Sequence, residues 1–280
     1  MPVAINLDVM GKERDPVIFT YDEDRVILYA LSIGAGVDEL DFIYEKNLKV
    51  FPSFAVVPLT PMVVYYLENL NFNWATVLQL EQKIIQHKPI PPTGTIILRG
   101  RVDSIYDKGD KGAIANLLFA GRREDGELLY ELGLTFLDRS AGHFGGERGM
   151  KGDRIIPPEG KPPDFAVEYP IPLNQAALYR LTGDKNPLHI DPEFAARGGF
   201  DKAVLHGLCT YGYTVRAIIH RVCGSDPSRF KSFAAQFMGL VFPGDRLIIQ
   251  GWRVDEKRYI IQTKNQDDRI VLGSAVAEVR

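Results

Sequence analysis

Cysteine is scarce in this chain, since only Cys209 and Cys223 occur among its 280 residues. Two cysteines are too few for a disulfide framework, and their spacing does not match that of metal ligands, which fits a reducing compartment. An excess of positive charge is also absent, because the formal net charge is -3 and the sequence pI is about 6.0. Without a broad basic surface, nucleic acid is not expected as a partner.

Long apolar runs are missing as well. The longest, such as Ala113 to Ala120, fall far short of the roughly 20 residues that a membrane-spanning helix needs. The N-terminus shows no basic segment followed by an apolar core, so neither a membrane span nor a secretory signal is expected. The remaining composition, 45% hydrophobic and 25% charged, predicts a soluble globular protein of one large domain or two ordinary ones.

An internal repeat runs through the chain with an offset of 150 residues. Tyr29–Ser32 corresponds to Tyr179–Thr182, and Gly94–Val102 resembles Gly244–Val254. Each of the latter two stretches opens a series of strand-like segments separated by turns, so each half is expected to end in an antiparallel meander.

Glycine and proline crowd the stretch 141–172, which has no periodic apolar pattern. This composition predicts a linker between the two repeats. The chain is therefore expected to comprise a first domain at 1–140, the linker, and a second domain at 173–280.

A helix is predicted from about Gly207 to Val222, where apolar residues recur at helical spacing. They are Leu208, Tyr211, Val215, Ile218, Ile219 and Val222. Gly224 supplies a C-terminal stop. One helix lying across a curved antiparallel sheet, twice over, describes an α+β fold of two hot-dog domains in tandem; the alternative is two unrelated α+β domains.

The stretch with the most chemical content holds Asp184 and His189, set five residues apart. Gly183 and Pro187 make a continuous helix improbable, so a loop can turn both side chains inward. An imidazole can accept a proton from water near neutral pH, and a neighbouring carboxylate can share or deliver one. Asn186 could orient either group. Alternatively, Asp184 caps a turn and His189 is a structural core histidine.

Tyr179–Ala195 resembles the signature of the hydratase 2 family, the MaoC-like R-specific 2-enoyl-CoA hydratases. The resemblance continues into Val204–Leu208 and Phe242–Asp245. In the first half, His87–Gly94 and Phe144–Arg148 are similar to segments of the eukaryotic two-domain form, which occurs as the hydratase portion of the peroxisomal multifunctional β-oxidation enzyme. The resemblance covers nearly the whole chain.

The resemblance implies reversible hydration of trans-2-enoyl-CoA to (3R)-3-hydroxyacyl-CoA, with no metal and no cofactor beyond the coenzyme A of the substrate. It assigns the catalytic pair to Asp184 and His189, a supporting role to Asn186, and the oxyanion donor to the backbone N–H of Gly207. The first N–H groups of a helix are unsatisfied and reinforced by the helix dipole, which suits that last role. His206, beside Gly207, is expected to be structural.

The first half lacks this machinery, because Tyr29–Leu40 stands where the motif should be and contains no Asn-Pro-Leu-His. The resemblance implies that this half shapes a pocket for the acyl chain. Three apolar side chains are expected to contact the substrate: Val56, Ala55 and Leu208. Glu81–Gln82 is expected on a surface helix instead of in the site.

Three other functions compete with hydration of enoyl-CoA. One is dehydration of hydroxyacyl groups on an acyl carrier protein, which would use the same residues. A second is a thioesterase, against which the Asp-Asn-His motif argues, and a third is a non-catalytic acyl-CoA binding module. The expected partner is acyl-CoA, in a homodimer or as part of a larger multifunctional chain.

The cellular location follows from the resemblance and not from a signal. A peroxisomal enzyme is expected, although the C-terminal Ala277–Arg280 is not a Ser-Lys-Leu-type address. Such a signal would therefore lie outside this segment. A cytoplasmic location is the alternative.

Overall fold

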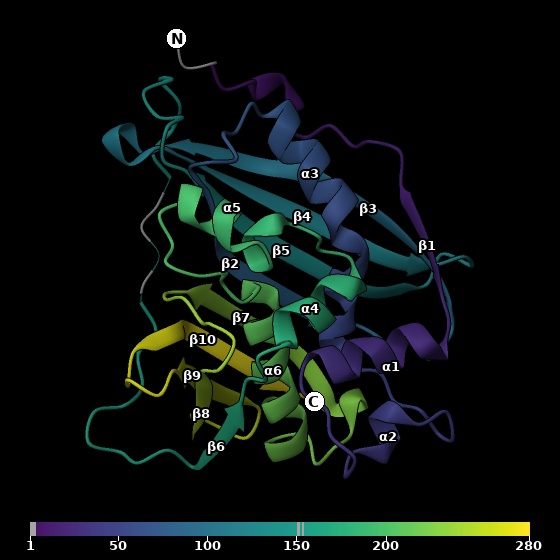
Figure 1. Cartoon of the computed structure of the whole chain (residues 1–280). Coiled ribbons are helices and arrows are strands. Elements are labelled where there is room, and N and C mark those ends of the chain that lie inside the picture. The colour runs from purple at the N-terminus through teal and green to yellow at the C-terminus, as the bar shows by residue number, and fades with distance from the viewer. Residues whose placement is uncertain (1–3, 150–151, 153) are drawn as a thin grey trace.

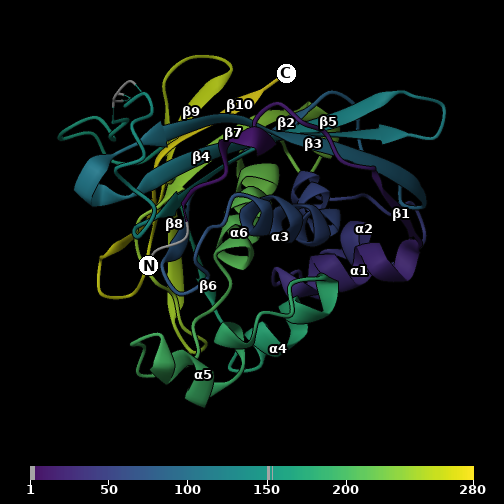
Figure 2. The ribbon, with the colours of Figure 1, turned by 90° about the horizontal axis from the view of Figure 1, so that it is seen from above.

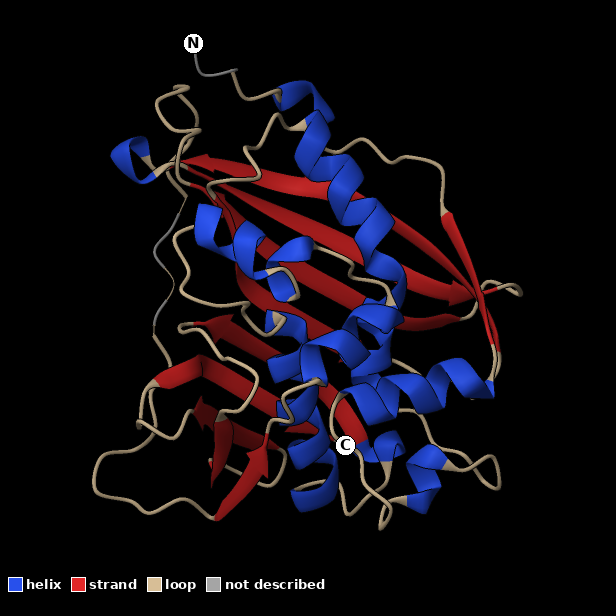
Figure 3. Cartoon of the chain, viewed as in Figure 1, coloured by secondary structure: helices blue, strands red, loops and turns tan. Residues whose placement is uncertain are grey.

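The computed structural model describes residues 4–149, 152 and 154–280, which form a curved antiparallel sheet with helices gathered against one face (Figures 1 and 3). The strands are β1 (Val17–Tyr21), β2 (Val77–Gln86), β3 (Gly94–Asp107), β4 (Ala113–Arg123), β5 (Leu128–Asp138), β6 (Phe165–Pro170), β7 (Phe230–Phe237), β8 (Arg246–Arg253), β9 (Arg258–Lys264) and β10 (Ile270–Val279). The α-helices are α1 (Glu23–Ser32), α2 (Leu40–Ile43), α3 (Thr60–Asn69), α4 (Gln175–Tyr179), α5 (Pro192–Arg197) and α6 (Gly207–Arg221). Short 3-10 helices are η1 (Leu7–Val9), η2 (Pro52–Leu59), η3 (Gly109–Lys111), η4 (Arg180–Thr182), η5 (Pro187–His189) and η6 (Pro227–Arg229).

The sheet has ten strands in the order β1-β3-β4-β5-β2-β7-β10-β9-β8-β6. The first five strands of this order come from the first repeat, and the last five mirror them from the second. The two halves meet where β2 pairs with β7, from Glu81 opposite Gln236 to Ile85 opposite Ser232. The predicted tandem of hot-dog domains is confirmed, with the added finding that their sheets join edge to edge into one.

The repeat is also visible in hydrogen bonds between the halves. Arg25 on α1 donates from Nη2 to the carbonyl of Thr182 at 3.4 Å. Gln175 on α4, 150 residues later, donates from Nε2 to the carbonyl of Ser32 at 2.5 Å. Each residue of one bond is the repeat counterpart of a residue in the other, so a pseudo-twofold axis relates the halves.

Two central helices, α3 and α6, lie in the hollow of the curved sheet, as Figure 2 shows from above. The predicted helix is confirmed, but it is buried on all sides and not on its apolar face alone, because Cys209–Ile219 is buried throughout, including the polar Thr210 and Thr214. The helix stops just before Gly224, which has a φ of +64°, and the N–H of Ser225 returns to the carbonyl of Ile219 at 2.9 Å. Across the described ranges, no helix combines the length and apolar character needed to cross a bilayer.

Two details differ from expectation. Glu81–Gln82 lies in β2 and not on a surface helix, and the Gln82 side chain is fully buried, where it accepts a hydrogen bond from Gln79 at 3.0 Å. Buried polar groups are tolerated in a strand at the middle of the sheet when they are hydrogen-bonded in this way. In addition, β6 lies inside the expected linker 141–172 and pairs with β8, so the second half begins before the predicted position 173.

Candidate active site

The loop that carries Asp184 begins where Gly183 breaks the preceding turns with a φ of +148°. A Cβ at Gly183 would lie 3.1 Å from the carbonyl oxygen of Val57, so the loop packs closely on η2 of the first half. Oδ1 of Asp184 accepts from the N–H of Asn186 at 3.1 Å. Oδ1 of Asn186 accepts in turn from the N–H of Leu188 at 3.0 Å and caps η5. These local bonds of short polar side chains shape the loop.

His189 is held by its Nδ1, which donates to the carbonyl of Val204 at 2.8 Å. A carbonyl oxygen only accepts, so Nδ1 carries the proton and Nε2 keeps a free lone pair. Burial lowers the pKa of His189 below its ordinary value of 6.5, against the opposing charge of Asp184 and the bond to Val204. The imidazole is therefore neutral at physiological pH and is suited to accept a proton.

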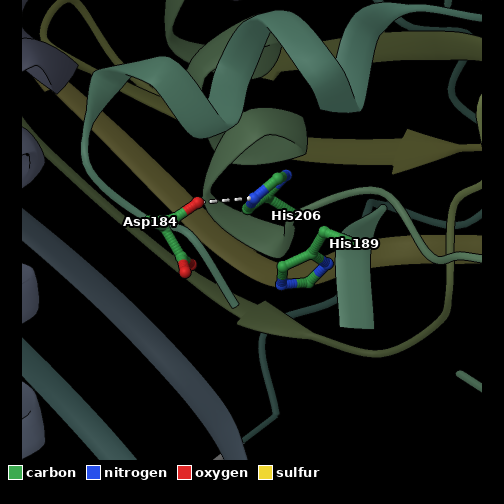
Figure 4. A group of neighbouring side chains, drawn as sticks. All are labelled: Asp184, His189 and His206. Atoms are coloured by element: carbon green, nitrogen blue, oxygen red, sulfur yellow. Dashed lines mark hydrogen bonds between the residues drawn. The ribbon is translucent and has the colours of Figure 1, made fainter. Parts of the chain in front are cut away.

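Asp184, His189 and His206 gather around one space, as Figure 4 shows. A carboxylate oxygen of Asp184 and one ring nitrogen of each histidine all lie within 4.8 Å of one another. The two imidazole rings stack with centroids 3.8 Å apart and an interplanar angle of 30°. Nε2 of His206 donates to the backbone carbonyl of Asp184 at 3.2 Å. The cluster thus joins a carboxylate to a neutral base.

The same three side chains could in principle hold a metal ion, since two imidazoles and a carboxylate are common zinc ligands. However, Nε2 of His206 is engaged with the Asp184 carbonyl. A metal at that nitrogen would require the ring to give up this bond and move its proton to a buried Nδ1 that has no partner among the described residues. The hydrogen-bonding pattern favours acid–base chemistry over metal ligation.

The first turn of α6 lies beside this cluster. His206 is the N-cap residue of α6 but makes no side-chain cap, and Gly207 is the first helical residue. Within the described part of the chain, the N–H of Gly207 donates to no protein acceptor, as expected for an orphan donor at a helix start. A Cβ at Gly207 would lie 3.1 Å from Cε1 of Phe237, so the glycine also relieves crowding.

The structure thus brings Asp184, His189 and the Gly207 helix terminus together, while the other predicted site residues lie around them. Asn186 is exposed, and its bond to Leu188 serves the loop. Leu208 is half-buried beside Gly207. Their roles stay predictions.

Ala55 and Val56 lie in η2, where they are 0% and 4% exposed. They belong to the first half, and η2 contacts α6 as well as the loop that carries Asp184. The proposed contact of both residues with the acyl chain also stays a prediction.

His206 was expected to be structural, and the contacts of its side chain agree with that expectation. Its place before the first glycine of a helix was visible in the sequence, but its contacts with both Asp184 and His189 were not. The hollow of about 530 Å³ formed by Gly152, Arg154, Gln236, Met238 and Ile270 includes none of the cluster. The site is therefore identified by the chemistry of its side chains and not by the size of a cavity.

In a comparison with known proteins, each half of the chain matches a protein family. The family described as "MFE-2 hydratase 2 N-terminal domain" matches residues 19–140, and the family described as "MaoC like domain" matches residues 155–273. A solved structure titled as a MaoC-like dehydratase from Phytophthora capsici superposes with a TM-score of 0.87 at 28% identity, over 99% of this chain and 98% of that one.

Two curated relatives match almost end to end. The protein named peroxisomal enoyl-CoA hydratase 2 of Arabidopsis thaliana is 35% identical over 94% of this chain and 91% of its own length. The protein named 3-hydroxyacyl-thioester dehydratase Y of Mycobacterium tuberculosis is 36% identical over 99% of this chain and 96% of its own length. Asp184 and His189 are hereafter called the dyad, and the loop that carries them the dyad loop. Given the fold, the dyad loop and these matches, the chain belongs to the MaoC-like hydratase 2 family in its double hot-dog form.

Proposed function

We propose that this protein is a hydro-lyase that reversibly hydrates trans-2-enoyl-CoA to (3R)-3-hydroxyacyl-CoA in fatty acid β-oxidation. The observation that carries the proposal is the tautomer of His189. Its Nδ1 proton is committed to the Val204 carbonyl, which leaves a free lone pair on Nε2 of a ring that lies next to Asp184. The names of the relatives support the same reaction class.

The geometry suggests how the reaction proceeds. Nε2 of His189 accepts a proton from water while the water oxygen bonds to the β-carbon of the enoyl thioester. The double-bond electrons move toward the thioester oxygen, where the N–H of Gly207 and the α6 dipole stabilise the developing negative charge. The proton that His189 accepted then passes through Asp184 to the α-carbon, which restores the neutral imidazole and the carboxylate. Because the proposed base and the proposed proton carrier belong to one cluster, both parts of water are expected to add to the same face. No metal or redox cofactor is required.

The test is a direct assay of the purified protein with crotonyl-CoA and with a long-chain trans-2-enoyl-CoA. Hydration removes the conjugated double bond, so the absorbance of the enoyl thioester should fall, and chiral analysis should find the 3R alcohol. A 3S product would contradict the assignment. An unchanged absorbance with measurable acyl-CoA binding would indicate a non-catalytic acyl-CoA module.

A second candidate is dehydration of 3-hydroxyacyl groups carried on an acyl carrier protein. The resemblance to a protein named as a 3-hydroxyacyl-thioester dehydratase favours it, and the same dyad would run the reaction in reverse. The two candidates differ in the thioester that they accept. Comparing kcat/KM for the same acyl group on coenzyme A and on a carrier protein separates them, and we expect coenzyme A to be preferred.

We infer a peroxisomal location in a eukaryotic source, supported by the name of the plant relative. A cytoplasmic location is the alternative, because another relative is bacterial. The protein is proposed to act as a homodimer or as part of a larger multifunctional chain. Light scattering of the 280-residue chain would distinguish a dimer from a monomer.

A further inference from the structure

His206 is one of the most buried polar residues of the second half, at 1% exposed. Its backbone is fixed on both sides: the N–H of Leu205 donates to Val241 at 2.8 Å, and the His206 carbonyl accepts from Cys209 and Thr210 in the first turn of α6. The residue therefore cannot move without moving the start of the helix, where the Gly207 N–H lies.

The side chain of His206 contacts both members of the catalytic pair. Its Nε2 donates to the backbone carbonyl of Asp184 at 3.2 Å, and its ring stacks on His189 at 3.8 Å. The ring centroid of Tyr179 lies 4.9 Å from that of His206, and the two ring planes are inclined by 49°. One imidazole thus joins the dyad loop to the terminus of α6.

The protonation of His206 is fixed as well. Since the Asp184 carbonyl can only accept, Nε2 carries the proton, and Nδ1 is buried with no partner among the described residues. Burial, assisted by the neighbouring His189, lowers the pKa of His206 to about 3. Because Nε2 is engaged with a backbone carbonyl and the lone pair of Nδ1 is buried, neither nitrogen of His206 is open to exchange a proton with the substrate. Its contacts must therefore act through position.

We propose that His206 is a positioning residue that sets the separation of Asp184, His189 and the Gly207 N–H. This inference rests on the proposed hydration of enoyl-CoA. Misplacement of a reacting group by about 1 Å can cost about 100-fold in rate. Loss of His206 should therefore lower kcat far more than it raises KM.

Two substitutions separate the ring from its hydrogen bond. His206→Phe keeps a flat ring to stack on His189 but removes the donor to Asp184, and His206→Gln keeps a donor near that place but removes the ring. For crotonyl-CoA hydration, we expect His206→Phe to lose about 100-fold in kcat. His206→Gln should recover about tenfold of this loss, the contribution of one hydrogen bond. KM should change little in either variant.

A third variant, His206→Ala, tests the effect on the base. Removing the ring admits water beside His189, whose pKa is held down mainly by burial. The acid limb of the kcat/KM profile should therefore move to higher pH. Tyr213→Phe is the matched control, because it deletes a buried side-chain hydrogen bond on the same helix, to Gln175, without touching the dyad.

The outcomes are distinguishable. All rates are divided by the folded fraction from circular dichroism, so loss of fold is not counted as loss of turnover. Wild-type kcat in His206→Phe, or an unmoved acid limb in His206→Ala, would overturn the proposal while wild-type hydration still stands. If each His206 variant loses no more rate per folded molecule than Tyr213→Phe, the role is only structural and the proposal is wrong. Absence of hydration by the wild-type protein would instead refute the proposed function.

Discussion

The two halves of the chain share one topology but enter their central helices differently. In the second half, α6 starts directly at Gly207, with its first N–H groups open beside the dyad loop. In the first half, α3 is preceded by η2, eight buried residues with Pro52 and Pro58. The repeat counterparts Tyr29 and Tyr179 still meet at the junction, with ring centroids 6.4 Å apart.

This difference shows what the chemistry requires beyond the fold. An open helix terminus offers partial positive charge to a developing anion, while a terminus covered by apolar residues does not. The dyad loop itself packs on η2 through Gly183 and Val57. The first half therefore supports the candidate site of the second half by packing against it, but its described residues contain no such site of their own.

The largest effect is expected from removing the catalytic pair. Asp184→Asn and His189→Ala should each lower kcat by at least about 100-fold, the usual scale for a positioned acid or base. Because the two groups are proposed to act on one water, the double variant should be little slower than the slower single variant. Steady-state kinetics with crotonyl-CoA measures all three, and losses that multiply would mean independent roles.

The second prediction concerns the open terminus of α6. Gly207→Pro removes the N–H at a position where a helix tolerates proline, and the extended backbone of His206, with φ of -55° and ψ of 130°, suits the residue before a proline. Loss of one oxyanion donor should cost about 3 to 4 kcal/mol of transition-state stabilisation, with a smaller change in KM.

Gly207→Ala is the control for that experiment. It adds a Cβ, 3.1 Å from the ring of Phe237, but keeps the N–H. We expect it to retain most of the activity that Gly207→Pro loses. Equal losses in both variants would assign the effect to crowding and exclude the oxyanion role.

A third prediction tests how the halves are held together. Glu39 of the first half receives hydrogen bonds from Arg216 and His220 on α6, from Arg216 Nε at 2.9 Å and from His220 Nε2 at 2.6 Å. Burial raises the pKa of Glu39, but the bonds from His220 and Arg216 outweigh it and lower the pKa to about 2. Glu39→Gln leaves the Arg216 charge without its partner and should lower the free energy of unfolding by about 3 kcal/mol.

The pH dependence of this pair has a definite sign. Since the folded pKa lies below the ordinary 4.5, the stabilisation is complete above pH 4.5 and is lost as the pH falls through about 2. Urea unfolding at several pH values should find that Glu39→Gln and wild type differ most above pH 4.5 and converge below it. Glu45→Gln, at an exposed position nearby, should match wild type throughout. A constant difference between Glu39→Gln and wild type would refute the linkage.

The smallest effect is expected in the first half. If η2 borders the acyl chain, Val56→Phe should raise KM for a long-chain enoyl-CoA several-fold, as each buried CH₂ contributes about 0.8 kcal/mol. KM for crotonyl-CoA should not change. Phe is chosen because the larger side chain of Trp would overpack these positions, where Ala55 is 0% and Val56 is 4% exposed. Leu98→Phe, equally buried in β3, controls for overpacking alone, and equal effects on both substrates would place the chain elsewhere.

Much of this architecture could be predicted because the two halves have recognisably similar sequences. The offset of 150 residues and the apolar face of α6 specify the halves and their central helix. Glu81–Gln82 was misassigned because polar residues in a central strand depend on partners from other strands, such as Gln236 on β7. Local patterns carry no information on such partners.

Part of the geometry of the candidate site could also be predicted. The sequence motif predicts that Asp184 and His189 lie together, as they do, but the tautomer of His189 depends on the carbonyl of Val204, fifteen residues away. The contacts of His206 likewise arise when a helix start folds back on the loop. Such non-local contacts are fixed by tertiary structure, and only the coordinates provide them.

The pH dependence of kcat/KM tests the neutral His189 base most directly. Burial places the pKa of His189 below its ordinary 6.5, and a base must be unprotonated to act. Hydration of crotonyl-CoA should therefore be constant near neutral pH and fall only below pH 6.5, and the residual activity of His189→Ala should lack this limb. An acid limb centred above pH 6.5, or the same limb retained in His189→Ala, would contradict the account.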